Sequence, residues 1–194
     1  MYYGVYKNLR NGAWNCLLDF HVNRLPIDVR SIAKEAGIHV VRNSSVNELL
    51  PTENGKSFFY DNQWIIIYND KNATELSRFT VAHELGHIFL GHELQNAKYM
   101  GTQEFNKKTK VEQYADQFAI RLLCPACVLW GLDLHTADEI ATYCRIENQL
   151  AATRAKRMQL LYERQKFLTS DVEQQVFKNF ADYIEQNKAV PSLR

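Results

Sequence analysis

The chain of 194 residues is 46% hydrophobic and 23% charged, and its 23 Lys and Arg balance 22 Asp and Glu to a net charge of +1. This composition is typical of a globular protein with a core, and it excludes a largely disordered chain or one drawn to nucleic acid by net charge. No apolar run approaches the roughly 18 residues of a membrane-spanning helix, and no export signal precedes the first elements. We therefore expect a cytoplasmic protein.

Taken in chain order, the predicted elements form a helix, a small sheet and then further helices. They are a short helix within residues 1–25, a helix over 26–36, a strand over 38–41, a loop over 43–56, a hairpin of strands 57–60 and 63–68, a helix over 74–90, a helix over 109–124, and helices from 136 onward. Asp61 and Asn62 suit the hairpin turn, and the aromatic and β-branched run Trp64–Tyr68 suits a packed strand. Pro26 suits the first turn of the helix over 26–36, and Gly37 suits its end.

The helix predicted over 74–90 contains an HExxH motif, His83-Glu84-Leu85-Gly86-His87. Two histidines four residues apart lie on one face of a helix, so both imidazoles can bind one zinc ion. Glu84 lies on the flank of that face, where it can reach a water on the metal without being a ligand. This is the position that a general base requires.

The next helix offers the third protein ligand that a catalytic zinc needs. Glu112 and Asp116 are four residues apart and share one helix face. We predict that Glu112 binds zinc and that Asp116 accepts the free ring N–H of a zinc-bound histidine, with Asp116 as the alternative ligand. Gly86 and Ala115 are small, which predicts a close approach of the two helices.

Other side chains with metal-binding chemistry fit this pattern less well. His92 follows His87 by five residues, whereas a metzincin places its third histidine six residues on, so a histidine at a helix end is favoured. Cys124 and Cys127 have CxxC spacing without a second pair, and we interpret them as reduced structural thiols. Three histidines without a partner pattern are predicted to be structural: His21, His39 and His135.

These motifs together resemble the ImmA/IrrE family of metallopeptidases, found in bacteria, phages and mobile elements. The segments that carry the resemblance are Phe79–His87 with Leu90-Gly91-His92, Glu112–Ala119, and Leu122-Leu123-Cys124-Pro125. The resemblance spans about residues 26–165 and implies a gluzincin-like zinc endopeptidase. It assigns His83, His87 and Glu112 to zinc and Glu84 to catalysis, and it gives Asp116 a supporting role rather than a ligand role.

The resemblance also implies a fold and a domain organisation. The expected class is α+β, with a zincin-like core over residues 1–135, in which a small and mainly antiparallel sheet packs on the HExxH helix and the Glu-bearing helix. Residues 136–194 are expected to be helical and in part helix-turn-helix-like, with helices over 136–144 and 150–158. The turn at 145–147 lacks glycine, and the basic residues that follow favour a solvated helix face over contact with phosphate.

The leading hypothesis is a zinc-dependent endopeptidase that cleaves a cytoplasmic regulatory protein. Family members act on helix-turn-helix repressors, which the resemblance implies as the partner. Glu84 would take a proton from zinc-bound water and pass it to the leaving amine, while the substrate lies along an edge of the sheet, with Trp64–Tyr68 as the substrate-side strand. One alternative is a non-proteolytic regulator that binds a repressor or DNA and holds a structural zinc, and another is a subunit of a toxin–antitoxin pair. Glu84 favours the enzyme, because a structural zinc has no use for that carboxylate.

Overall fold

The computed structural model describes residues 9–92, 98–99 and 109–188 of the chain. Contacts group the chain into two units, one of Met1–Gly12 with Asp28–Ala119 and the other of Ala13–Ile27 with Ile120–Arg194. Helices α1 (Leu9–Asp19) and α5 (Lys110–Leu123) each contribute residues to both units. The sequence boundary predicted at residue 135 lies within the second unit and stays a prediction. Within the described part of the chain, no helix has the length and apolar character needed to cross a bilayer.

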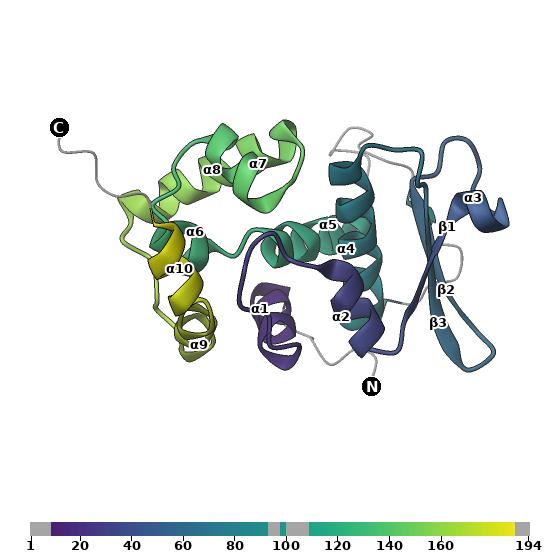
Figure 1. The fold of residues 1–194 in the computed structure, drawn as a ribbon, viewed down its shortest axis with the longest axis horizontal. Coiled ribbons are helices and arrows are strands. Elements are labelled where there is room, and N and C mark those ends of the chain that lie inside the picture. Colours follow the sequence, from purple (N-terminus) through teal and green to yellow (C-terminus); the bar gives the residue numbers. More distant parts are fainter. Residues whose placement is uncertain (1–8, 93–97, 100–108, 189–194) are drawn as a thin grey trace. The chain divides into compact units, whose positions relative to one another are not determined.

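The first unit is built on a four-stranded sheet with the strand order β1-β3-β2-β4 (Figure 1). The strands are β1 (His39–Arg42), β2 (Gly55–Tyr60), β3 (Gln63–Tyr68) and β4 (Lys98–Tyr99). β1 pairs with β3 in parallel, and the other two pairings are antiparallel. The predicted α+β class with a small, mainly antiparallel sheet is confirmed.

Strands β2 and β3 form the predicted hairpin around Asp61 and Asn62. Both residues have positive φ, 47° and 59°, which is the backbone of a two-residue turn whose twist matches the strands. β3 pairs with β1 on one side and β2 on the other, so neither of its edges can accept a further strand. The prediction that Trp64–Tyr68 is the substrate-side strand is therefore wrong. The sequence pattern identifies this strand but not the parallel docking of β1 beside it.

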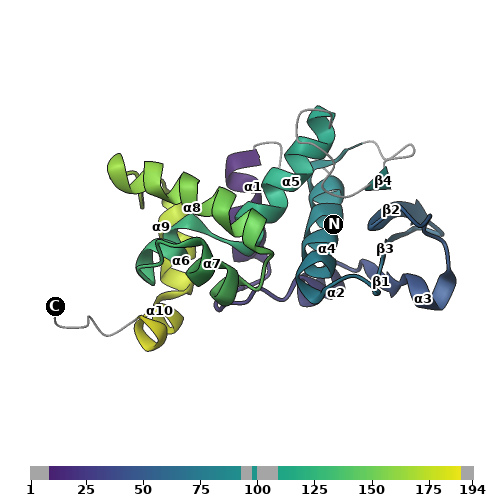
Figure 2. The same ribbon diagram turned by 90° about the horizontal axis from the view of Figure 1, so that it is seen from above.

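Helices α2 (Val29–Glu35) and α4 (Thr74–Leu90) cover one face of this sheet, and the short helix α3 (Asn43–Val46) lies on the other side (Figures 1 and 2). α4 has the predicted bounds. α2 is shorter than the predicted helix over 26–36, because the Asp28 carboxylate accepts two backbone N–H groups of the first turn and so leaves Pro26 outside the helix. The predicted loop over 43–56 contains α3 and the start of β2.

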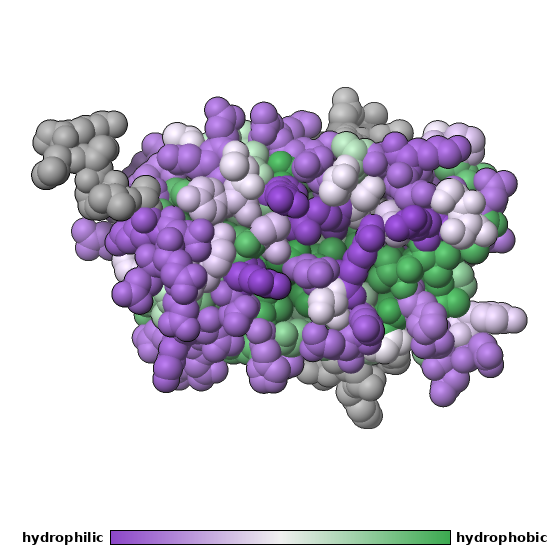
Figure 3. Space-filling view, viewed as in Figure 1, coloured by the Kyte–Doolittle hydropathy of each residue, from purple (hydrophilic) through white to green (hydrophobic). Residues whose placement is uncertain are grey.

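Apolar side chains are exposed at the hairpin end of the sheet. Phe59 and Tyr60, at the end of β2, are both exposed, and Phe59 meets Trp64 edge to face with ring centroids 5.4 Å apart. Figure 3 shows hydrophobic side chains at the surface over the strands, amid hydrophilic ones.

The second unit is helical, as predicted for the chain from residue 136 onward. Its further helices are α6 (Ala126–Gly131), α7 (Ala137–Cys144), α8 (Asn148–Glu163), α9 (Asp171–Asn179) and α10 (Ala181–Asn187). The Thr136 hydroxyl and the Glu139 carboxylate cap the start of α7 reciprocally. α7 packs on α8 across a turn in which Arg145, rather than a glycine, adopts a left-handed conformation with φ of 50°.

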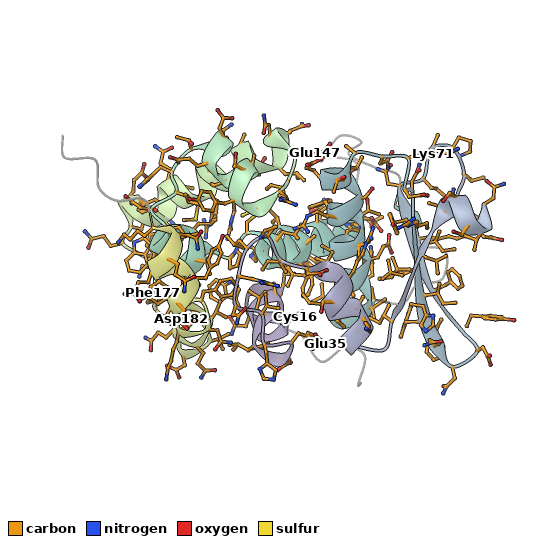
Figure 4. All side chains as sticks on the ribbon, viewed as in Figure 1. Cys16, Glu35, Lys71, Glu147, Phe177 and Asp182 are labelled. Carbon is orange, nitrogen blue, oxygen red and sulfur yellow. The ribbon has the colours of Figure 1, made fainter. Side chains whose placement is uncertain are left out.

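Helix α6 was not predicted from the sequence, and it packs closely against α9 and α10. A Cβ atom at Gly131 would lie 2.7 Å from Cε2 of Phe177, which Figure 4 labels on α9, and 2.8 Å from Cδ1 of Ile184. The run Ala126–Gly131 is buried almost throughout, so it lacks the one-sided periodicity by which a surface helix is recognised.

All four cysteines are buried free thiols: Cys16, Cys124, Cys127 and Cys144. Cys16 lies on α1 and is labelled in Figure 4. Burial, reinforced by the nearby charge of Glu173, raises the pKa of the Cys127 thiol to about 12. Cys124 and Cys127 are more completely buried than a position at a helix end suggests, and their interpretation as reduced structural thiols stays a prediction.

Candidate metal centre

The two histidines of the HExxH motif lie on the most deeply buried part of α4. Residues 79–89 of this helix are buried without exception, and the exposed fractions of His83 and His87 are 0% and 1%. Their Nε2 atoms are 2.9 Å apart. Two imidazoles one helical turn apart are thereby aimed at one point, as the i, i+4 spacing predicts.

Helix α5 supplies a carboxylate at the same point. Glu112 places Oε2 3.2 Å from Nε2 of His83 and Oε1 3.3 Å from Nε2 of His87. These three side chains each offer a ligand atom, and the three atoms lie within 4.8 Å of one another. Two imidazole nitrogens and one carboxylate oxygen form a donor set typical of catalytic zinc, which keeps a fourth position open. The sequence-predicted ligands are thus brought together, and their role as ligands stays a prediction.

Small residues let α4 and α5 cross closely enough to share this cluster. Figure 1 shows α5 crossing α4, and a Cβ atom at Gly86 would lie 3.2 Å from Cα and O of Ala115 and 3.2 Å from Cδ1 of Phe118. At such distances an added methyl group forces its neighbours to move. The predicted close approach of the two helices at Gly86 and Ala115 is confirmed.

Each of the two histidines also has a partner at its other ring nitrogen. Nδ1 of His83 lies 2.9 Å from Oδ1 of the buried Asp116, the contact expected from the sequence. Nδ1 of His87 lies 3.1 Å from Nδ1 of His92. Partners of this kind fix the tautomer and the ring orientation, leaving both Nε2 atoms for a metal.

The sequence pattern predicts His92 only as a histidine at a helix end, and it does not predict the contact of His92 with His87. Gly91 ends α4 with φ of 70°, and the backbone N–H of His92 donates to the carbonyl of His87. The glycine therefore turns His92 back over the last turn of the helix. Burial and the charge of His87 lower the pKa of His92 to about 4, so His92 is neutral at pH 7 and its Nδ1 can accept a hydrogen bond from the Nδ1–H of His87. The sequence Leu90-Gly91-His92 is the signal that could have indicated this.

The charged groups of the cluster shift one another's pKa values. Burial alone would lower the pKa of His83, but its hydrogen bonds with Asp116 and Glu112 raise that pKa to about 9. Burial opposes ionisation of Glu112, but hydrogen bonds with His83 and His87 lower its pKa well below the usual range. In the metal-free protein at pH 7, Glu112 is therefore ionised and His83 is protonated. A divalent cation that binds there replaces the His83 proton.

Glu84 lies beside the cluster with a different environment for each of its oxygens. It is 1% exposed, and its Oε2 accepts a hydrogen bond of 2.5 Å from the hydroxyl of Ser57 on β2. Its Oε1 is buried and has no hydrogen-bond partner among the described residues. Burial raises the pKa of Glu84, while His83, His87 and the Ser57 hydrogen bond oppose that shift. A buried carboxylate oxygen without a partner is suited to accept a proton from a substrate or a water, which fits the donor set beside it.

Comparison with protein-family models matches residues 33–156 to the model described as Peptidase_M78, IrrE N-terminal-like domain. The matched range includes the sheet strands β1 to β3, helices α4 and α5 with the cluster, helix α7 and the first half of α8. No curated protein matches the chain.

Proposed function

Because the chain belongs to the Peptidase_M78 family, and because a buried His-His-Glu cluster lies beside a catalytic-type carboxylate, we propose that it is a zinc-dependent endopeptidase. The observation that carries the proposal is the combination of three ligand atoms with Oε1 of Glu84, which has no partner among the described residues. A purely structural zinc site would use four protein ligands and would have no need of this carboxylate.

His83, His87 and Glu112 would hold the metal, with Asp116 and His92 fixing the two imidazoles. When bound, zinc polarises the carbonyl of the scissile peptide bond and lowers the pKa of the attacking water to about 7. Glu84 would accept the proton of that water through Oε1 and then donate it to the nitrogen of the leaving amine. The buried surroundings of Glu84 strengthen this role, because a raised pKa brings the carboxylate closer to the pH at which it must both take and give a proton.

We further propose that the substrate is a cytoplasmic helix-turn-helix repressor, cleaved to release phage, mobile-element or stress-response genes. The support is the resemblance of the HExxH and Glu-bearing segments to ImmA/IrrE peptidases, which act on such repressors. The repressor as partner and the cytoplasmic location rest on this resemblance.

The first test measures bound zinc per chain in three proteins: the wild type, Glu112→Ala and Glu84→Gln. We expect about one zinc in the wild type and in Glu84→Gln, and a sharp loss in Glu112→Ala. Glu35→Ala is the matched control, because Glu35 is an exposed carboxylate on α2, labelled in Figure 4, with no part in the cluster. If Glu112→Ala binds as much zinc per chain as the wild type, Glu112 is not the third ligand.

The second test measures cleavage of a mixed-sequence peptide library and of a helix-turn-helix repressor encoded beside the gene. The zinc-loaded wild type should cleave, and Glu84→Gln should not, although it binds zinc. A wild type that binds the repressor and zinc without cutting any peptide would refute the peptidase and support a non-proteolytic regulator. Cleavage of library peptides without cleavage of the repressor would keep the enzyme and refute the proposed partner.

A further inference from the structure

Strand β2 and helix α4 meet along two matched pairs of residues. Gly55 lies against Thr80, where an added Cβ atom would overlap the threonine methyl group, and Ser57 lies against Glu84. Two residues along a strand advance by about 6.6 Å, and four residues along a helix advance by about 6 Å. The two spacings agree closely, so the absence of a side chain at Gly55 brings the strand near enough for Ser57 to reach the carboxylate.

Both residues of the contact between Ser57 and Glu84 are buried. Ser57 is 4% exposed and Glu84 is 1% exposed, and the hydroxyl donates to Oε2 over 2.5 Å. The Ser57 hydroxyl is the donor, and its single proton is committed to Oε2. The short distance is typical of a strong hydrogen bond.

This hydrogen bond gives the two carboxylate oxygens of Glu84 different roles. Holding Oε2 fixes the rotation of the carboxylate group, and it leaves Oε1 as the oxygen with no partner among the described residues. We propose that Ser57 is a positioning residue for the reaction: its hydroxyl orients Glu84 so that Oε1 accepts the proton of the attacking water. The proposal rests on the proposed peptidase function and adds to it a residue from the sheet that none of the HExxH or Glu-bearing segments contains.

A structural role and a positioning role of the Ser57 hydroxyl predict different experimental results. A structural role predicts that removal of the hydroxyl lowers zinc content or substrate binding along with turnover. A positioning role predicts that kcat falls while KM and zinc content are retained, and that the loss depends on Glu84. The effect on kcat is expected to be about 10- to 100-fold, the scale on which small misplacements of catalytic groups act.

The experiment compares the wild type with Ser57→Ala, Ser57→Thr, Glu84→Gln and the double variant Ser57→Ala/Glu84→Gln. The probe is the quenched fluorescent peptide that the wild type cleaves fastest out of the library. We expect Ser57→Ala to lower kcat with unchanged KM and zinc, Ser57→Thr to restore most of it, and Ser57→Ala to have no further effect in the Glu84→Gln background. Ser44→Ala is the matched control, because Ser44 donates to the Asp70 carboxylate in an exposed contact of the same unit.

A second readout does not depend on catalysis. Urea unfolding of the four zinc-free proteins in the Ser57/Glu84 cycle measures whether the two side chains are energetically coupled. Absence of coupling, or a Ser57→Ala variant with the kcat of an active wild type, would overturn the proposal and leave the peptidase function intact. Loss of zinc or a raised KM in Ser57→Ala would overturn it in favour of a structural hydroxyl. A zinc-loaded wild type that cleaves nothing would instead refute the proposed function, and the positioning role with it.

Discussion

Replacing Gly86 by alanine should push apart the two helices that carry the candidate metal ligands. The new Cβ atom would lie 3.2 Å from two backbone atoms of Ala115 and from Cδ1 of Phe118, so neighbours must move by a few tenths of an ångström. Overpacking of this kind costs about 1–3 kcal/mol. Alanine gains about 1 kcal/mol over glycine in a helix, so the net destabilisation should be about 0–2 kcal/mol.

The larger effect of Gly86→Ala should be on zinc rather than on stability. His83 and His87 lie on α4 and Glu112 on α5, and metal–ligand distances tolerate only about 0.2 Å of change. We expect zinc affinity to fall by about 10- to 100-fold, the range seen when the support of a ligand is disturbed. Competition with a chromophoric chelator measures the affinity, and urea unfolding of the zinc-free protein measures the stability.

Gly131→Ala is the control for this experiment, because its added Cβ atom would also meet neighbours, at 2.7 Å from Phe177 and 2.8 Å from Ile184, but in the second unit. It should destabilise the protein without changing zinc affinity. If Gly86→Ala bound zinc as tightly as the wild type and unfolded at the same urea concentration or higher, the close crossing of α4 and α5 at Ala115 would be refuted.

Three further predictions concern the surroundings of the two histidines. Zinc affinity should rise about tenfold per pH unit as the pH increases toward 9, because the proton on His83 must leave before a metal binds. Chelator competition across this pH range measures the affinity. An affinity that does not change with pH contradicts the prediction. Asp116→Asn should weaken zinc binding about 10- to 100-fold, as measured by calorimetry, because the ring N–H of His83 loses a charged acceptor. His92→Ala should weaken it by about tenfold, near the low end of that range, because His92 is only half-buried; an affinity equal to that of the wild type would remove His92 from the site.

The parts of the site that could be predicted are those set by local helical geometry. His83, Glu84 and His87 lie within one turn of a single helix, so their relative placement follows from the helical repeat. Glu112 could be proposed because its own helix shows the same regularity and a catalytic zinc needs a third ligand. The burial of the two helices against each other was indicated by Gly86.

Ser57 could not be predicted, because its contact depends on tertiary register. Which residue of β2 faces Glu84 is set by how the strand docks on α4, and a single sequence carries no record of that docking. The same reason explains the incorrect assignment of Trp64–Tyr68 to a sheet edge. The pattern of a strand shows that it is packed, but not which strands lie on either side of it.

The buried thiols give this protein a chemical reporter on one of its two units. The chain has four cysteines, and all of them, Cys16, Cys124, Cys127 and Cys144, belong to the second unit. An alkylating reagent reaches them only when that unit opens. While Cys127 is buried, its raised pKa also keeps the thiol protonated and therefore unreactive. Mass spectrometry of the unaltered chain can therefore follow the opening of the helical unit alone. Repeating the labelling with zinc present would test whether metal binding in the first unit changes the rate at which the second unit opens.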